Sequence, residues 1–320
     1  MIALKSKFNR CLILPKYLSI QKELRAFSAT GFILSMTLLG LVGCGGGSDS
    51  DSKSVTTTTT KEQTETCVGQ ALLEGASCLK FQNREAVVYK PIEDPTAIAL
   101  LLHGAPGHPN KVTQLFDAQM LSNKMSWLSV APQGGAGGTW GWSSLNDGEE
   151  TSNLDVDYVS DLLDELAAQY NVTSNKVYIL GYSAGGFMGY KLACLIPEKL
   201  TAVITLAGQF RGDFEACPTS TAVALHHFHS PSDTDVPMEG RTFGDITSVE
   251  NTLNHWRLIN GCAETSTITE NAGVTSTSSA TLTTQWNNCI KPVSYSSMAN
   301  VNHESSYLSE VLYDIYKGSL

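Results

Sequence analysis

Short apolar runs and helix-type patterns alternate along the chain from Ala86 onward. In 155–170, leucines and valines recur every three or four positions, which predicts an amphipathic helix. Helices are also predicted at 187–195, 249–259 and 306–316. The runs that predict strands are 86–89, 97–102, 127–131, 176–180, 202–206, 222–228, 281–286 and 293–297. This alternation is typical of an α/β fold with a mainly parallel central sheet and helices on both faces.

The first 66 residues lack this alternation. Segment 1–43 holds six basic residues and one acidic residue, and its apolar run from about Ala29 to Gly43 follows the basic stretch, as in a secretory signal. That run of about 15 residues is shorter than the roughly 20 that a membrane-spanning helix needs. Segment 44–66 is polar apart from Val55, so it cannot bury enough surface to fold and predicts a flexible linker. One folded domain is therefore expected over 67–320.

Residues 41–44 read Leu-Val-Gly-Cys, which resembles the lipobox of bacterial lipoproteins. The resemblance implies that Cys44 becomes the lipid-carrying first residue of an exported protein, anchored in a membrane. Because Gly45 rather than Asp follows, it also implies sorting to the outer membrane or the cell surface. An ordinary cleaved signal with an incidental cysteine is the alternative interpretation.

The composition indicates a folded, acidic protein. Hydrophobic residues make up 42% and charged residues 16%, so a large core is expected. Segment 263–280 is rich in Thr, Ser and Asn, which predicts a surface loop or hairpin. Of the 21 basic and 31 acidic residues, 15 and 30 remain after residue 43. A net charge of about −15 disfavours nucleic acids and other anionic polymers as partners.

Six of the eight cysteines lie in the expected folded domain, since Cys11 belongs to the signal and Cys44 to the lipobox. In an exported protein these six are expected to form disulfides, with fifteen possible connectivities, of which the sequential set closes three short loops. No Cys-x-x-Cys or His-x-x-x-His cluster suggests a metal site, so no metal ion is expected. The six are Cys67, Cys78, Cys194, Cys217, Cys262 and Cys289.

The strongest chemical signal is Gly-Tyr-Ser-Ala-Gly at 181–185, between a predicted strand and a predicted helix. In such a nucleophile elbow the serine occupies a strained turn, and the small residues around it let neighbouring backbone approach. Ser183 is therefore the candidate nucleophile. A chance match in a glycine-rich chain is the alternative.

A serine hydroxyl needs a histidine to accept its proton and an acid to orient that histidine. Downstream of the elbow, His303 lies on a loop after the last predicted strand, whereas His255 lies within a predicted helix, so His303 is favoured as the base. The acid is expected in the loop after the strand that ends near residue 228. Asp233 and Asp235 both qualify by position.

Hydrolysis also needs hydrogen-bond donors for a developing oxyanion. The backbone N–H of Ala184 is one candidate, and the second is expected in the loop 104–107, at Ala105; a plain tight turn is the alternative for this loop. His103 is expected to brace the loop. The tryptophans Trp140 and Trp142, in a glycine-rich loop, are candidates for substrate binding or for packing.

Five stretches between about Ile98 and His303 resemble one family, the poly(3-hydroxybutyrate) depolymerase and feruloyl esterase branch of the α/β-hydrolases. They read LLHGAPG, DVDYVSDLLDELAAQYNVTSNKVYILGYSAGGFMGYKLAC, ITLAGQFRG, HFHSPSDTDVP and HWRLINGC. The resemblance implies an α/β-hydrolase catalytic domain over 67–320. Because the family's acid stands in a His-Gly-x-x-Asp-x-x-Val-Pro pattern, it implies Asp233 rather than Asp235. It also implies two disulfides, Cys194–Cys217 and Cys262–Cys289.

The chain departs from that family around His303, where it reads NVNHES and lacks the usual following Trp-Pro. Trp140 or Trp142 is expected to take the place of the missing tryptophan in a substrate subsite. The predicted function is hydrolysis of a small or oligomeric carboxylic ester through an acyl-enzyme, with no cofactor. A peptidase of the same fold and a non-catalytic surface-binding lipoprotein are the alternative hypotheses.

Overall fold

The computed structural model describes residues 65–135, 141–149, 152–173 and 176–320. The predicted signal peptide, the lipidation site Cys44, nearly all of the predicted linker and Trp140 lie outside these residues, so those expectations stay predictions. No helix of the described residues is long and apolar enough to cross a membrane.

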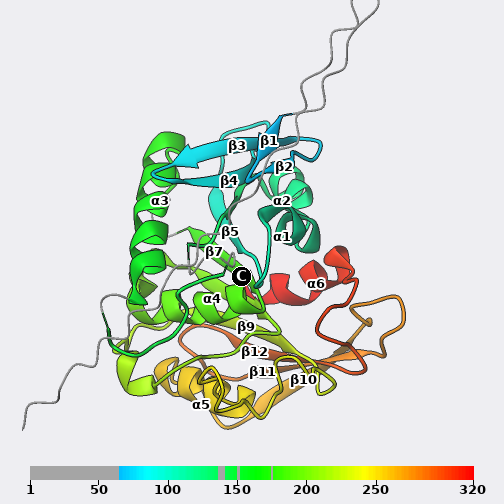
Figure 1. Ribbon diagram of the computed structural model, residues 1–320. Helices are drawn as coiled ribbons and strands as arrows, with labels where there is room; N and C mark the ends of the chain where they lie inside the picture. The colour runs from blue at the N-terminus through cyan, green and yellow to red at the C-terminus, as the bar shows by residue number, and fades with distance from the viewer. Residues whose placement is uncertain (1–64, 136–140, 150–151, 174–175) are drawn as a thin grey trace, which may run out of the picture. The chain divides into compact units, whose positions relative to one another are not determined.

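A mixed sheet forms the centre of the folded part (Figure 1). Its strand order, over the described residues, is β10-β11-β12-β9-β8-β7-β5-β6-β4-β3. The strands from β12 to β6 run parallel to their neighbours, and antiparallel strands extend the sheet at both ends. The expected mainly parallel centre is thus confirmed. The strands are β3 (Ala76–Phe81), β4 (Arg84–Tyr89), β5 (Ala97–Leu102), β6 (Trp127–Pro132), β7 (Val177–Tyr182), β8 (Ala202–Leu206), β9 (Ala224–His229), β10 (Ser266–Asn271), β11 (Thr281–Trp286) and β12 (Val293–Met298).

The parallel strands are apolar on both sides because helices cover both faces of the sheet. In β5, Ile98 and Leu100 enter one core and Ala99 and Leu101 the other. The first core packs against α3 (Leu154–Tyr170), α4 (Ala184–Leu195) and α5 (Val249–Ile259), and the second against α1 (Pro109–Leu115), α2 (Ala118–Met125) and α6 (Ser309–Tyr316). Figure 1 shows α1, α2 and α6 on the side of the sheet opposite α3 and α4.

Elements that the hydrophobic pattern did not predict are short or lie at the sheet edges. β3 is a half-exposed outer strand, α1 and α2 have seven and eight residues, and β1 (Thr66–Cys67) and β2 (Gln70–Ala71) form a two-residue ribbon. The stretch 263–280 contains the exposed strand β10, paired antiparallel with β11, which agrees with the hairpin interpretation. Such elements bury few side chains and therefore leave a weak apolar period.

The six cysteines form the sequential disulfides Cys67–Cys78, Cys194–Cys217 and Cys262–Cys289. The two pairings implied by the family resemblance are therefore confirmed. Cys194 lies in the last turn of α4 and Cys217 lies before β9, so the second disulfide joins the segment that follows the elbow to the segment that leads to the acid loop. Three disulfides are typical of proteins that fold outside the reducing cytosol.

We expect the double variant Cys194→Ala/Cys217→Ala to lose about 3 kcal/mol of unfolding free energy, because a crosslink over 23 residues restricts the unfolded chain. The measurement is urea unfolding without reductant. Cys67→Ala/Cys78→Ala, which opens an 11-residue loop, is the comparison and should lose less. An unchanged midpoint in the first variant would contradict this expectation.

Candidate active site

Ser183 lies in the turn between β7 and α4, with φ 53° and ψ −118°. This left-handed backbone region is unfavourable for a residue with a side chain, so the surrounding structure must hold it. The Ser183 N–H donates to the carbonyl of Leu206 at 2.8 Å, and the Ser183 carbonyl accepts from the N–H groups of Gly186 and Phe187. The serine backbone is thus tied to β8 on one side and to α4 on the other.

The glycines of the motif allow this turn because a side chain would collide with backbone. A Cβ on Gly185 would lie 2.0 Å from the carbonyl oxygen of Leu102, and one on Gly181 would lie 2.2 Å from the carbonyl oxygen of Gly185. Backbone atoms cannot move aside as a flexible side chain can. The motif therefore meets a steric requirement, which agrees with a nucleophile elbow and not with a chance match.

His303, on the loop after β12, lies beside Ser183. Its Nε2 is 2.9 Å from Ser183 Oγ, and its Nδ1 is 2.7 Å from Asp233 Oδ2. All three side chains are buried, with 9%, 5% and 7% exposure for Ser183, Asp233 and His303. They follow the parallel strands β7, β9 and β12, whose carboxyl ends meet at one edge of the sheet. His255, in contrast, stacks on Phe214 at 4.3 Å between ring centroids.

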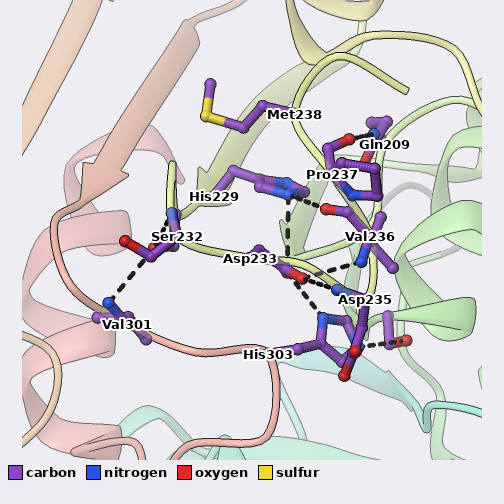
Figure 2. Close-up of polar contacts among 12 residues, drawn as sticks. Gln209, His229, Ser232, Asp233, Asp235, Val236, Pro237, Met238, Val301 and His303 are labelled. Carbon is purple, nitrogen blue, oxygen red and sulfur yellow. Dashed lines mark hydrogen bonds and ion pairs between the residues drawn. The ribbon is translucent and has the colours of Figure 1, made fainter. Parts of the chain in front are cut away.

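Of the two candidate acids, the structure places Asp233 against the histidine. Its Oδ1 accepts the backbone N–H groups of Asp235 and Val236, while Oδ2 accepts from His303, as Figure 2 shows. Burial raises the pKa of the Asp233 carboxyl, but the hydrogen bonds from His303 and Val236 lower it more, so the net pKa is below its ordinary value. The carboxylate is therefore held charged.

Two tyrosines fix the backbone beside the imidazole. The hydroxyls of Tyr182 and Tyr307 donate to the carbonyl oxygen of His303 at 3.0 and 3.3 Å. The Tyr182 ring also stacks on the His303 ring, 5.3 Å between centroids. Tyr182 is the variable residue of the elbow motif, so one short segment supplies both the serine and a support for its partner.

A chain of buried histidines on β9 holds the acid loop, and sequence analysis did not single it out. His229 Nε2 lies 2.8 Å from the carbonyl oxygen of Val236, which can only accept, so this nitrogen carries the proton. His229 Nδ1 then accepts from His227 Nε2 at 3.2 Å. His227 Nδ1 in turn accepts from the hydroxyls of Thr205 and Tyr190 at 2.7 and 2.9 Å. The unusual run His-His-Phe-His in an apolar strand was the available signal.

Burial and mutual repulsion keep these imidazoles neutral. Desolvation lowers the pKa of His227 well below its ordinary value, and the neighbouring histidines lower it further. Desolvation also lowers the pKa of His229. His229 Nε2, the neutral donor to the Val236 carbonyl, lies 3.7 Å from Asp233 Oδ2 (Figure 2). A neutral His229 does not compete with His303 for an ion pair with the Asp233 carboxylate.

His226 directly precedes His227 on β9, and its side chain lies on the opposite face of the sheet, where it hydrogen-bonds Ser319 and Ser296. Complete burial lowers its pKa to about 3. Below pH 6.5 the unfolded chain takes up a proton at this residue and the folded chain does not, so stability should fall as the pH falls from 6.5 toward 3.

We expect His226→Gln to weaken this pH dependence. In the wild type, the His226 contribution to the loss of unfolding free energy between pH 7 and pH 5 should be about 2 kcal/mol. Urea unfolding at the two pH values, for wild type and variant, isolates that contribution because the other histidines are common to both proteins. An identical loss in both proteins would contradict a neutral, buried His226.

Ala105 and Ala184, which carry the candidate oxyanion donors, line one cavity of about 690 Å³ together with Ser183. Ala184 is the first residue of α4, so its N–H has no partner within the helix, and the positive end of the helix dipole lies there. His103 accepts the N–H of Gly134 and donates to the carbonyl of Gly104. This agrees with the expectation that His103 braces the loop.

Trp142 both packs and lines the cavity. Its indole Nε1 donates to the carbonyl of His103 at 2.8 Å, and its ring lies 5.0 Å from the His103 ring. Only 5% of Trp142 is exposed. A role of Trp142 in substrate binding stays a prediction.

Among the described residues, the only cluster of side chains that could ligate a metal is Cys67, Cys78 and Glu85. Its two cysteines are joined in a disulfide.

The sequence of the folded domain matches one known protein family. The model of the phospholipase/carboxylesterase family matches residues 83–255, more than half of the chain. The chain belongs to this family. The match includes the elbow and Asp233, and it ends before His303, which the structure brings to the same site.

This phospholipase/carboxylesterase family member also matches curated proteins. It is 27% identical over 153 residues to a bifunctional acetylxylan esterase/xylanase, XynS20E, of Neocallimastix patriciarum, covering 47% of this chain and 21% of that protein. It is 28% identical over 171 residues to a probable feruloyl esterase C of Aspergillus terreus, covering 53% and 54%. The chain thus spans about half or less of the length of these two relatives.

Solved structures share the fold of this family member. An acetyl xylan esterase from Aspergillus awamori superposes with a TM-score of 0.55 at 14% identity, over 77% of this chain and 99% of that one. An S-formylglutathione hydrolase from Agrobacterium tumefaciens gives 0.53 at 11% identity, over 79% and 97%. At these identities the likeness shows the α/β-hydrolase fold alone.

Proposed function

We propose that this chain is a serine carboxylic-ester hydrolase. The observation that carries the proposal is the continuous hydrogen-bonded series Ser183–His303–Asp233 at the edge of the sheet. It supplies a hydroxyl, a base within reach of it and a charged group that orients the base. Membership of the phospholipase/carboxylesterase family supports the same reaction.

In the proposed mechanism, His303 Nε2 takes the proton of Ser183 as Oγ attacks the ester carbonyl carbon. The backbone N–H groups of Ala105 and Ala184 stabilise the oxyanion of the tetrahedral intermediate. The alcohol leaves with the proton from His303, and an acyl-enzyme remains. Water then attacks that ester, giving its proton to His303, and the acid is released as the proton returns to Ser183. Asp233 stabilises the imidazolium in both steps.

The substrates that fit this proposal are poly- or oligo-hydroxybutyrate and feruloyl or acetyl esters of polysaccharides. The sequence resemblance supports both classes, and the names of the curated relatives support the second. Trp142 is proposed as an apolar wall for either, because it lines the cavity with Ser183. A graded panel of hydroxybutyrate oligomers and of feruloylated and acetylated sugars separates the two classes.

We expect Ser183→Ala to lower kcat on p-nitrophenyl butyrate by roughly 10⁶-fold, because no other group can form the acyl-enzyme. Asp233→Asn should lower kcat by roughly 10⁴-fold, since the imidazole then loses its preferred tautomer. Ser266→Ala, on the exposed edge strand β10, is the matched control and should retain wild-type kcat.

A fluorophosphonate probe separates the alternatives to this function. An adduct on Ser183 in wild type, together with ester turnover, supports the proposal. Folded protein without an adduct would favour the non-catalytic binding module. An adduct together with peptide cleavage and no ester turnover would favour the peptidase.

We also propose that the enzyme is exported and lipid-anchored through Cys44, at the outer membrane or cell surface. The three disulfides support export, and the Leu-Val-Gly-Cys sequence supports the anchor. Mass spectrometry of the protein from bacterial membranes should find an acylated Cys44 as its first residue. A soluble protein with an unmodified amino end would contradict the anchor, and Cys44→Ala should release the protein from the membrane fraction.

A further inference from the structure

Two arginines line the same cavity as Ser183. Arg211 follows β8, and Arg241 lies in the segment between the acid loop and α5. The proposed mechanism uses neither of them. Both nevertheless bring a permanent positive charge to the wall of the cavity.

Arg211 is half-buried and is held in place by uncharged groups. Its Nε donates to the carbonyl oxygen of Gly244 at 2.6 Å, and its Nη1 lies 3.4 Å from the hydroxyl of Ser144. A guanidinium has five N–H donors, so these contacts use only part of its capacity. Within the described residues the arginines that form ion pairs are Arg84 and Arg257, and Arg211 is not among them.

Arg241 also lacks an ion pair within the described part of the chain. Its Nη1 donates to the backbone carbonyl of Asp235 at 2.9 Å, which ties it to the acid loop. Burial lowers the pKa of Arg211, Asp245 raises it, and the charge of Arg241 lowers it again. Arg211 and Arg241 each form an isolated β-bridge with Ile246, so their segments are adjacent and both side chains line one cavity. Their like charges repel each other, and an anion bound near both would relieve that repulsion.

The acids at the cavity form no ion pair with either arginine among the described residues. Glu304 is engaged by Lys111 Nζ at 2.6 Å and by the Tyr182 hydroxyl at 3.1 Å. Asp235 also lines the cavity, and it contacts Arg241 through its backbone carbonyl, while its carboxylate forms no ion pair with a lysine or arginine of the described residues. Asp245 attracts Arg211 but forms no ion pair with it, so neither arginine is paired with a carboxylate of the described residues. Both can therefore bind a negatively charged group from outside the protein.

We propose that Arg211 and Arg241 form a carboxylate-binding subsite, so that the preferred esters carry a carboxylate on the acyl or the alcohol part. This inference rests on the proposed ester hydrolysis at Ser183. A planar guanidinium matches the geometry of a carboxylate, and a charge-assisted hydrogen bond is stronger than a neutral one. The subsite would hold the substrate with its carbonyl beside the serine.

Two features limit the length and place of the anion. The adjoining cavity of about 730 Å³ shares Arg241 but is lined by the acids Asp147, Asp213, Glu239 and Asp245, which repel an anion. The chain as a whole has a net charge of −10, which disfavours long polyanions. A short ester with a single carboxylate, such as a hydroxy-acid oligomer with a free acid end, fits both conditions.

The test compares esters that differ by one carboxylate. For the alcohol part, the linear dimer of 3-hydroxybutyrate is compared with its carboxamide. For the acyl part, mono-p-nitrophenyl adipate is compared with p-nitrophenyl hexanoate. We expect wild type to show a ~10-fold or larger preference, in kcat/KM, for the charged ester of one pair. A preference in the first pair places the bound carboxylate on the alcohol part, and a preference in the second places it on the acyl part. Added salt should reduce this preference.

Arg211→Gln and Arg241→Gln should each reduce the preference, measured as the ratio of the two kcat/KM values, by about tenfold. Arg211→Lys should restore part of it, because the charge remains without the planar fork. Arg257→Gln is the matched control, since Arg257 pairs with Glu264 and does not line the cavity. Its ratio should equal that of wild type.

Equal kcat/KM for the members of both pairs in wild type would overturn the carboxylate subsite while ester hydrolysis stands. A preference that survives in the Arg211→Gln/Arg241→Gln double variant would also overturn it. Thermal unfolding of each variant identifies any misfolded protein. If a Gln variant is misfolded, the ratio measured for Arg211→Lys replaces it, and a ratio equal to that of wild type would overturn the subsite. If wild type turns over none of the four esters and takes no fluorophosphonate adduct, the proposed function fails, and this inference fails with it.

Discussion

The close contact between α4 and β5 is the constraint on which the rest of the site depends. Because Gly185 has no side chain, the first turn of α4 lies directly against the backbone of Leu102. This contact accompanies the sharp reversal at Ser183 and places the first turn of α4 at the carboxyl end of β5. The loops after β9 and β12 reach the same end because the strands are parallel.

Charge is distributed unevenly around this site. The carboxylate of Asp233 is held by backbone N–H groups and by His303, whereas the imidazoles behind it stay neutral because they are buried. The Asp233 carboxylate thus has His303 on one side and neutral histidines on the other. The arginines line the same cavity from other loops, so the groups proposed for bond breaking and those proposed for binding are carried by different segments.

The sequence predicted the parallel centre of the fold and its large helices, because fully buried strands and amphipathic helices leave strong apolar patterns. It placed Ser183, Asp233 and His303 in loops that the structure brings together, since the elbow motif and the chain order restrict the choice. It did not reveal β3, α1 or α2, whose few buried side chains leave no clear period. Nor did it indicate His227, His229 or the arginines, because their roles depend on contacts between distant segments.

The histidine chain has a consequence for how this protein can vary. Tyr190 and Thr205 lie deep in the interior, yet their hydroxyls determine which nitrogen of His227 is protonated and, through His229, which donor reaches Val236. Loss of His227 leaves the buried Nδ1 of His229 without its donor, and loss of His229 removes the side-chain donor to the Val236 carbonyl. These positions are therefore expected to coevolve, with the whole set replaced by apolar residues or retained together.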